Sequence, residues 1–254
     1  MSLSREDMLR ELELLPVWQL REAPKPQPVA KIEQATPVIE PVAVEVAEPD
    51  LPALHVSLGQ GRREAIMQMD WQNLQECVAN CEACGLAKTR TQTVFGVGDP
   101  NAEWLIVGEA PGAEEDRKGE PFVGQAGKLL DNMLAAIKLK RGQNVYIANV
   151  LKCRPPENRD PQGEEVTQCD PFLKRQVELI KPKLIVALGK FAAQSLLNSE
   201  STIASMRGKL HDYHGVPVVV TYHPAYLLRN LPDKAKAWED LCFAVKTMQG
   251  LQSE

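Results

Sequence analysis

Four short apolar runs, separated by helical patterns, constrain the fold of this chain more than any other feature. The runs are residues 104–107 (WLIV), 145–148 (VYIA), 184–188 (LIVAL) and 216–220 (VPVVV). Continuous apolar runs of this length are typical of strands that are covered on both faces. Apolar residues at helical spacing follow them at 127–137, 164–180, 191–197 and 234–248. This alternation predicts an α/β fold, a three-layer α-β-α sandwich with a central, mainly parallel four-stranded sheet.

Polar segments follow three of the predicted strands. These segments are residues 108–112 (GEAPG), 149–156 (NVLKCRPP) and 222–225 (YHPA). In open parallel sheets, ligands bind outside the carboxyl ends of the strands. We therefore expect the three segments to converge on one cleft.

The first 70 residues differ in composition from the rest of the chain. They carry 7 Lys+Arg against 12 Asp+Glu, whereas residues 71–250 carry 22 against 21, and seven prolines fall between Pro24 and Pro52. Apolar residues at helical spacing near the start end at Pro16. The sequence predicts a short amphipathic helix or partner motif at 1–22, a Pro/Ala/Glu-rich disordered linker at 23–70 and one folded domain at 71–250.

Charge and hydropathy limit where such a chain acts. The formal net charge of −5 argues against non-specific coating of nucleic acid, although the near-neutral domain can still bind nucleic acid through a local basic patch. Residues 152–159 and Arg229 are candidates for that patch. No apolar run is long enough to span a membrane, and the charged N-terminus lacks the core of a signal peptide. We expect a cytoplasmic protein without membrane contact.

Six cysteines in a reducing compartment indicate metal ligation or free thiols rather than disulfides. Cys81 and Cys84 form a C-x-x-C pair, and Cys153 and Cys169 supply two more soft ligands. Four thiolates suit a 4Fe-4S cluster, and structural zinc on the same ligands is the alternative. The remaining two are predicted to be a free thiol (Cys77) and a buried core residue (Cys242).

Several side chains at the predicted strand ends carry chemistry. Glu109 follows a strand, where a buried carboxylate can orient water or stabilise positive charge on a sugar. His223 can donate a hydrogen bond to an oxygen that gains charge, although a lone histidine is more often structural. Asn149 offers a donor and an acceptor suited to the edge of a pyrimidine. Phe122 is a candidate for stacking on a base, with a place in the core as the alternative.

Taken together, these motifs resemble the family 4 uracil-DNA glycosylases, the thermostable-type enzymes with an iron-sulfur cluster. The resemblance runs from about Cys81 to Asp240. It includes GEAPG at 108–112 followed by Glu115, PFVGQAG at 121–127, NVLKCRPP at 149–156 and HPAYLLR at 223–229. Several long motifs in the same order are more specific than any one of them.

The resemblance implies a role for each matching position. Cys81, Cys84, Cys153 and Cys169 would ligate a structural 4Fe-4S cluster. Glu109 and His223 would be catalytic, with Glu115 as the reserve carboxylate. Substrate contacts would come from Glu115, Phe122, Asn149, Ala110 and Gly112. Ala110 fills the position of the water-activating aspartate of better-known uracil glycosylases, so the catalytic carboxylate has to come from elsewhere. The expected substrate is flipped uracil in DNA, with U opposite G as the product of cytosine deamination.

The N-terminal segment carries a second resemblance. Residues 5–12 (REDMLREL) and 16–21 (PVWQLR) are similar to the peptide by which the psi subunit of bacterial DNA polymerase III binds the chi subunit. This similarity implies chi as a partner through residues 1–22. It also leaves an alternative function open, a psi-like clamp-loader adaptor that uses a glycosylase-like domain as a scaffold.

Overall fold

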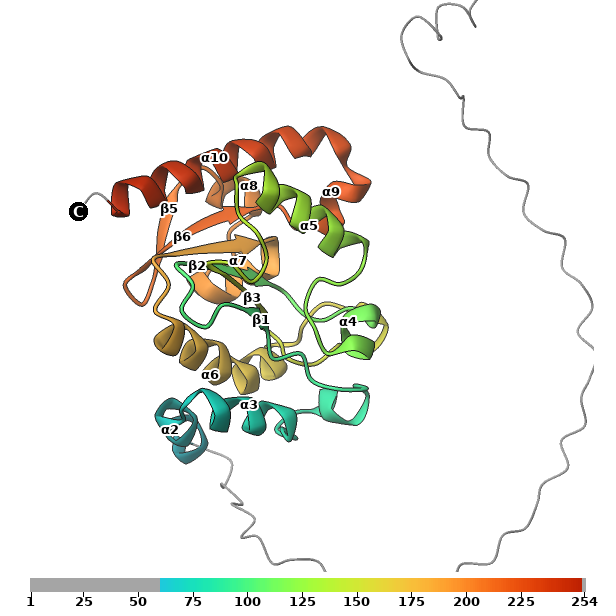
Figure 1. The fold of residues 1–254 in the computed structure, drawn as a ribbon. Helices are drawn as coiled ribbons and strands as arrows, with labels where there is room; N and C mark the ends of the chain where they lie inside the picture. The colour runs from blue at the N-terminus through green and yellow to red at the C-terminus, as the bar shows by residue number, and fades with distance from the viewer. Residues whose placement is uncertain (1–59, 253–254) are drawn as a thin grey trace, which may run out of the picture. The chain divides into compact units, whose positions relative to one another are not determined.

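The computed structural model describes residues 60–252, which fold around a six-stranded sheet with the order β1-β3-β2-β4-β6-β5 (Figure 1). The strands are β1 (Val97–Gly98), β2 (Trp104–Gly108), β3 (Val145–Asn149), β4 (Leu184–Leu188), β5 (Leu210–Tyr213) and β6 (Val216–Thr221). The central strands β3, β2, β4 and β6 pair in parallel, while β1 and β5 pair antiparallel at the two edges.

The α/β class and the parallel centre of the sheet are confirmed, but the predicted number of four strands was wrong. The two further strands lie at the edges, where one face or one side is open and a continuous apolar run is not required. β1 has only two residues, and three of the four residues of β5 are not buried. Neither strand therefore produces a strong pattern in the sequence.

The helices are α2 (Gln60–Gln68), α3 (Trp71–Ala79), α4 (Ala113–Lys118), α5 (Gln125–Ala136), α6 (Gly163–Ile180), α7 (Lys190–Leu197), α8 (Ile203–Met206), α9 (Pro224–Arg229) and α10 (Lys234–Leu251). Short 3₁₀ turns occur at η1 (Gly85–Lys88), η2 (Pro156–Asn158) and η3 (Leu231–Asp233). The four helices predicted from apolar spacing correspond to α5, α6, α7 and α10.

Alternate residues of the central strands enter two separate cores. Leu105 and Val107 of β2 pack in one core with side chains of α6 and α7. Trp104 and Ile106 pack in the other core with side chains of α5 and α10. Helices therefore cover both faces of the sheet, and this explains why all five residues of β2 are buried. The three-layer arrangement is confirmed.

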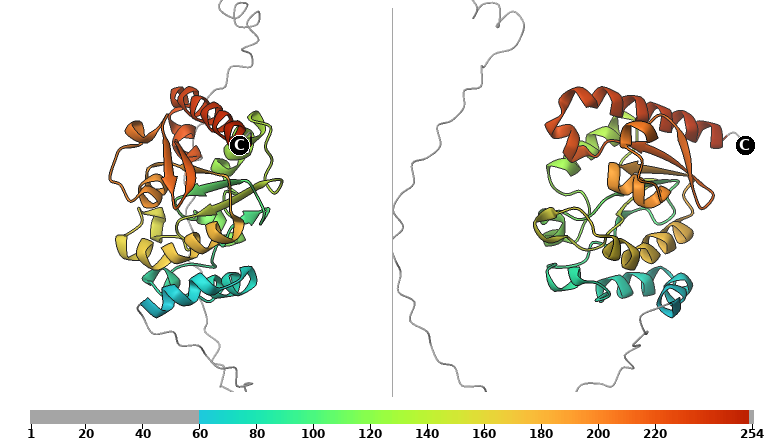
Figure 2. Two further views of the ribbon diagram at one scale, coloured as in Figure 1. Left: turned by 90° about the vertical axis from the view of Figure 1, so that its left-hand side faces the viewer. Right: turned by 180° about the vertical axis from the view of Figure 1, so that it is seen from behind.

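Helices α2 and α3 add to this domain on the outer side of α6, as the three views show (Figures 1 and 2). Ile66 of α2 and Leu74 of α3 are fully buried in a third core with Phe172 of α6. The Arg62 guanidinium donates to the Gln168 carbonyl at 2.9 Å. Residues 60–68, which belong to the predicted linker, thus form a packed helix instead. The motif predicted at 1–22 and residues 23–59 of the predicted linker lie outside the described residues.

Candidate functional site

A cleft of about 730 Å³ opens at the carboxyl ends of the four parallel strands. The polar segments after β2, β3 and β6 line it, as the sequence predicted, together with the start of α7. Of the predicted site residues, the cleft brings together Glu109, Ala110, Gly112, Glu115, Phe122, Asn149 and His223. Among residues 60–252, no helix is long and apolar enough to cross a membrane.

His223 lies at the N-terminus of α9 and caps it. Its Nδ1 accepts a hydrogen bond from the Ala225 backbone N–H at 3.1 Å. Since Nδ1 is an acceptor here, the proton of the neutral ring is on Nε2. Burial lowers the pKa of His223 to about 4, assisted by the Arg229 cation and opposed by Glu115. The imidazole is therefore a neutral Nε2–H donor near neutral pH.

Gly189 allows His223 to take this place. It follows β4 and has a φ of +89°, and a Cβ at this position would lie 2.9 Å from the Cβ of His223. A side chain there would be strained by its own backbone and would displace the imidazole.

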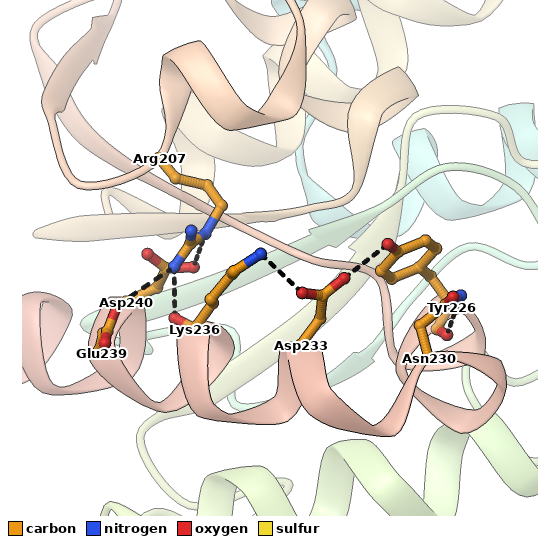
Figure 3. A network of polar contacts seen from close by, with 7 residues as sticks. All are labelled: Arg207, Tyr226, Asn230, Asp233, Lys236, Glu239 and Asp240. Atoms are coloured by element: carbon orange, nitrogen blue, oxygen red, sulfur yellow. Dashed lines mark hydrogen bonds and ion pairs between the residues drawn. The ribbon is translucent and has the colours of Figure 1, made fainter.

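A polar network anchors α9 to α10 (Figure 3). The Tyr226 hydroxyl donates to Asp233 at 2.6 Å, and Asp233 pairs with Lys236 at 2.8 Å. The Tyr226 ring also stacks on Tyr222, with centroids 5.1 Å apart. These contacts hold the helix whose first turn presents His223 to the cleft.

Phe122 adopts a strained conformation beside His223. Its ring stacks on the imidazole with centroids 5.5 Å apart and an interplanar angle of 30°. The Phe122 backbone has a φ of +55°, which is uncommon for a bulky residue and is often found at functional sites. A Cβ on Gly127 would lie 1.8 Å from the Phe122 carbonyl oxygen, so only glycine permits this close approach.

Two charged side chains hold the loop of Phe122 in this conformation. Glu115 accepts hydrogen bonds from the backbone N–H groups of Val123 and Gly124, at 2.9 and 3.1 Å. Arg141 donates to the carbonyl oxygens of Pro121 and Phe122, at 2.8 and 2.9 Å. Glu115 therefore positions the loop at the wall of the cleft, and its contact with substrate stays a prediction. Arg141 was missed because it lies in a charged stretch, Lys138-Leu139-Lys140-Arg141, that reads as plain surface.

The amide of Asn149 is available for a ligand. The side chain is 2 % exposed at the end of β3, and its Oδ1 atom has no hydrogen-bond partner. Buried polar atoms are normally satisfied, so an orphan acceptor at a cleft indicates a bound polar group. Gly108 on the neighbouring strand makes room, since a Cβ there would lie 2.4 Å from Asn149 Oδ1 and 2.6 Å from the Phe122 ring.

Glu109 is the carboxyl group with the most altered acidity in the cleft. Burial, with a smaller contribution from the Asp160 carboxylate, raises the pKa of Glu109 to about 7. Raised carboxyl pKa values of this size are typical of catalytic sites. Neighbouring Ala110 and Gly112 bring the backbone to the cleft without adding charge. Asp160 was missed in the sequence because it lies in a polar loop without a pattern.

The predicted phosphate-binding stretch is only partly available. Lys152 is 1 % exposed, so its prediction as a phosphate contact was wrong. Arg159 pairs with Glu165 of α6. Arg229 is exposed at the rim of the cleft. Lys190, at the start of α7, is a second exposed cation there.

The four predicted ligand cysteines line one small cavity between η1, α6 and the segment after β3. Polar donors face their sulfur atoms. Arg90 donates to Cys153 Sγ at 3.3 Å, the Lys152 backbone N–H donates to Cys169 Sγ at 3.2 Å, and Arg62 donates to Cys81 Sγ at 3.7 Å. Burial raises the pKa of the Cys169 thiol to about 12, opposed by Lys152. Donors and cations around buried sulfur favour bound thiolates, so these residues fit an anionic cluster.

Two further findings concern metal ligands and the remaining cysteines. Among residues 60–252, no group of three His, Cys, Asp or Glu side chains is arranged to hold a single metal ion. Cys77 is half-buried beside the cavity, whereas Cys242 is exposed on α10. The prediction that Cys242 belongs to the core was therefore wrong. It sits on the solvent side of an amphipathic helix, where burial depends on the helix face rather than on residue type.

Fold and cleft together define a class of protein. It is a doubly wound α/β protein whose cleft, at the carboxyl ends of its strands, is lined by a neutral histidine, an asparagine amide and a carboxyl group of raised pKa. Residues 95–242 match the family model of the uracil DNA glycosylase superfamily.

Comparison with individual relatives identifies the family within this superfamily. The chain is 52 % identical to the type-4 uracil-DNA glycosylase of Archaeoglobus fulgidus over 159 residues, which cover 59 % of this chain and 79 % of the relative. It is 44 % identical to that of Thermotoga maritima over 170 residues, 66 % of this chain and 86 % of the relative. It is 42 % identical to the type-4 uracil-DNA glycosylase of Pyrobaculum aerophilum over 183 residues, which cover 68 % of this chain and 92 % of the relative. The chain belongs to the uracil-DNA glycosylase superfamily and, within it, to the type-4 family.

Proposed function

We propose that this chain is a uracil-DNA glycosylase that hydrolyses the bond between uracil and its deoxyribose and so initiates base excision repair. The observation that carries the proposal is the grouping of a neutral His223, the unpartnered Asn149 Oδ1 and the half-buried Glu109 in one cleft. The relatives that cover most of the folded domain are named for the same activity.

Recognition of the base would rest on Asn149 and Phe122. The N3–H of uracil is a donor that can satisfy Asn149 Oδ1, whereas cytosine has an unprotonated N3 and would leave the oxygen unpaired. A site built to bond one edge of a base rejects an analogue that leaves its buried polar group unpaired. Phe122 would stack on the ring from its clamped loop. Access requires that the nucleotide is flipped out, at a cost of a few kcal/mol.

Bond cleavage would rest on two opposite developing charges. The departing uracil gains negative charge on O2, which the Nε2–H of His223 stabilises by hydrogen bonding. The sugar gains positive charge, which the ionised form of Glu109 stabilises before water adds. Such preorganised groups lower the barrier because they bind the transition state more tightly than the substrate. Since Ala110 carries no carboxyl group, Glu109 is the carboxylate of choice.

The four cysteines would hold a 4Fe-4S cluster. In such a cluster each thiolate binds a different iron, so its ligands surround a cavity instead of meeting at one ion. This agrees with four thiols that line one cavity. The cluster, when bound, would link Cys81 and Cys84, which precede the sheet, to Cys153, which follows β3, and Cys169 of α6.

The experiment that tests the function is cleavage of a uracil-containing oligonucleotide, followed by alkaline scission. We expect wild-type protein to cut, at a rate that increases as the pH rises through about 7, because Glu109 loses its proton there and gains its negative charge. His223 stays neutral in this range and does not contribute to the change. Glu109→Gln should lower the rate by roughly 10²-fold and abolish the pH dependence.

Glu164→Gln, at an exposed glutamate in the first turn of α6, is the matched control and should keep the wild-type profile. If iron-loaded wild-type protein leaves both single-stranded and double-stranded uracil DNA uncut, the proposed function is refuted and the adaptor alternative is favoured. A Glu109→Gln variant with the wild-type pH profile would exclude only the role of Glu109.

We further infer that residues 1–22 bind the chi subunit of DNA polymerase III, as their similarity to the psi peptide suggests, and that the protein acts in the cytoplasm. Deletion of residues 1–22 should abolish binding of purified chi while uracil excision is unchanged, because the cleft lies wholly within residues 109–229. Fluorescence anisotropy with labelled chi measures this binding. Equal chi binding with and without the segment would refute this partner.

A further inference from the structure

Lys152 is a buried cation that the proposed chemistry does not use. It lies directly between the uracil-recognition residue Asn149 and the cysteine ligands Cys153 and Cys169, and it is 1 % exposed. Its Nζ donates to the Asn149 carbonyl oxygen at 2.8 Å and to Gln176 Oε1 at 2.6 Å. Gln176 in turn donates to the Phe95 carbonyl at 2.9 Å. All of these acceptors are neutral.

Lys152 also lines the cavity of the four cysteines. None of the ion pairs formed by residues 60–252 includes Lys152. Burial lowers the pKa of Lys152 to about 8, and Cys169 and Cys153 oppose this shift. Its own backbone N–H donates to Cys169 Sγ at 3.2 Å. A buried cation without a partner is strongly unfavourable, so thiolates at these positions would stabilise it.

We propose that Lys152 is a positioning residue that couples the four-cysteine site to base recognition by Asn149. The inference rests on the proposed function. The negative charge of the bound thiolates holds the ammonium, and the ammonium holds the carbonyl at the end of β3. That carbonyl belongs to the residue whose side chain reads the base, so its position sets the direction of the amide. The cysteine site would thereby act on catalysis as well as on stability.

The test compares Lys152→Met with Lys246→Met in the iron-loaded full chain. Methionine fills the space of the lysine stem without charge, and Lys246 is an exposed lysine of α10. Two readouts are measured: the midpoint potential of the cluster and, for uracil DNA, the single-turnover rate at saturation with its Kd. We expect K152M to shift the potential to more negative values, because a cation beside the cluster favours the reduced form. We also expect an excision rate about tenfold lower with unchanged Kd, whereas K246M should match the wild type.

The outcomes separate this inference from the function on which it rests. A folded K152M with the wild-type potential, or with the wild-type rate, overturns the coupling while an active wild type keeps the proposed function. An inactive wild type overturns both. If K152M does not fold, Gln176→Leu replaces it, since this change keeps the charge and removes one acceptor of the ammonium. Q176L should keep the wild-type midpoint potential of the cluster and excise uracil severalfold more slowly than the wild type. A wild-type excision rate in Q176L overturns the coupling.

Discussion

Replacing His223 by alanine is expected to lower the single-turnover rate of uracil excision by roughly 10²- to 10³-fold, the usual effect of removing one donor to a developing anion. The expectation follows from the state of the ring. Nδ1 is occupied by the Ala225 N–H, and the pKa of about 4 keeps the imidazole neutral, so Nε2–H is the remaining donor. The loss should be the same at all pH values between 5 and 8, in contrast to the effect of Glu109→Gln.

A second substitution separates the two roles of this residue. His223→Asn retains a good N-cap for α9 but has no group in the place of Nε2. The asparagine variant should therefore recover the melting temperature of the wild type and remain as slow as the alanine variant. His214→Asn, in the exposed β5–β6 turn, is the control and should leave the rate unchanged. A fast His223→Asn enzyme would mean that His223 only caps the helix.

Replacing Cys169 by alanine is expected to release the metal centre and destabilise the domain. Cys169 is buried on α6, and its sulfur accepts the Lys152 N–H. Without the thiolate, Lys152 and Arg90 lose the anionic centre that compensates them. A decrease of about 3 kcal/mol in the free energy of unfolding would lower the melting temperature by roughly 10 °C in a domain of this size. Iron and sulfide content, visible absorbance and thermal unfolding measure these effects.

Cys77→Ala provides the matched control. Cys77 is half-buried against the same core as the ligand cysteines, so the substitution removes a similar volume from the same surroundings. It should keep iron and sulfide at the wild-type level. Full iron retention in Cys169→Ala would exclude this cysteine as a ligand. Stoichiometric zinc without iron in the anaerobically purified wild type would instead favour the structural zinc site.

Most of the fold could be predicted because its central strands are buried on both faces. That burial requires continuous apolar runs, and those runs identified β2, β3, β4 and β6 within a residue or two. The edge strands β1 and β5 carry no such requirement, and they were missed. Helix α2 was missed for a related reason, since its sequence is mostly polar and only Ile66 is fully buried.

The sequence by itself determined the four central strands and helices α5, α6, α7 and α10, the convergence of three polar segments on one cleft and the family to which the chain belongs. Only the tertiary structure decided the state of each group in that cleft. Burial raises the pKa of Glu109, the Ala225 N–H selects the tautomer of His223, and Arg141 clamps Phe122 from 19 residues away. Lys152, a basic residue in the sequence, became an internal cation. The reason is physical: acidity and hydrogen bonding depend on neighbours brought together by packing, which local patterns do not specify.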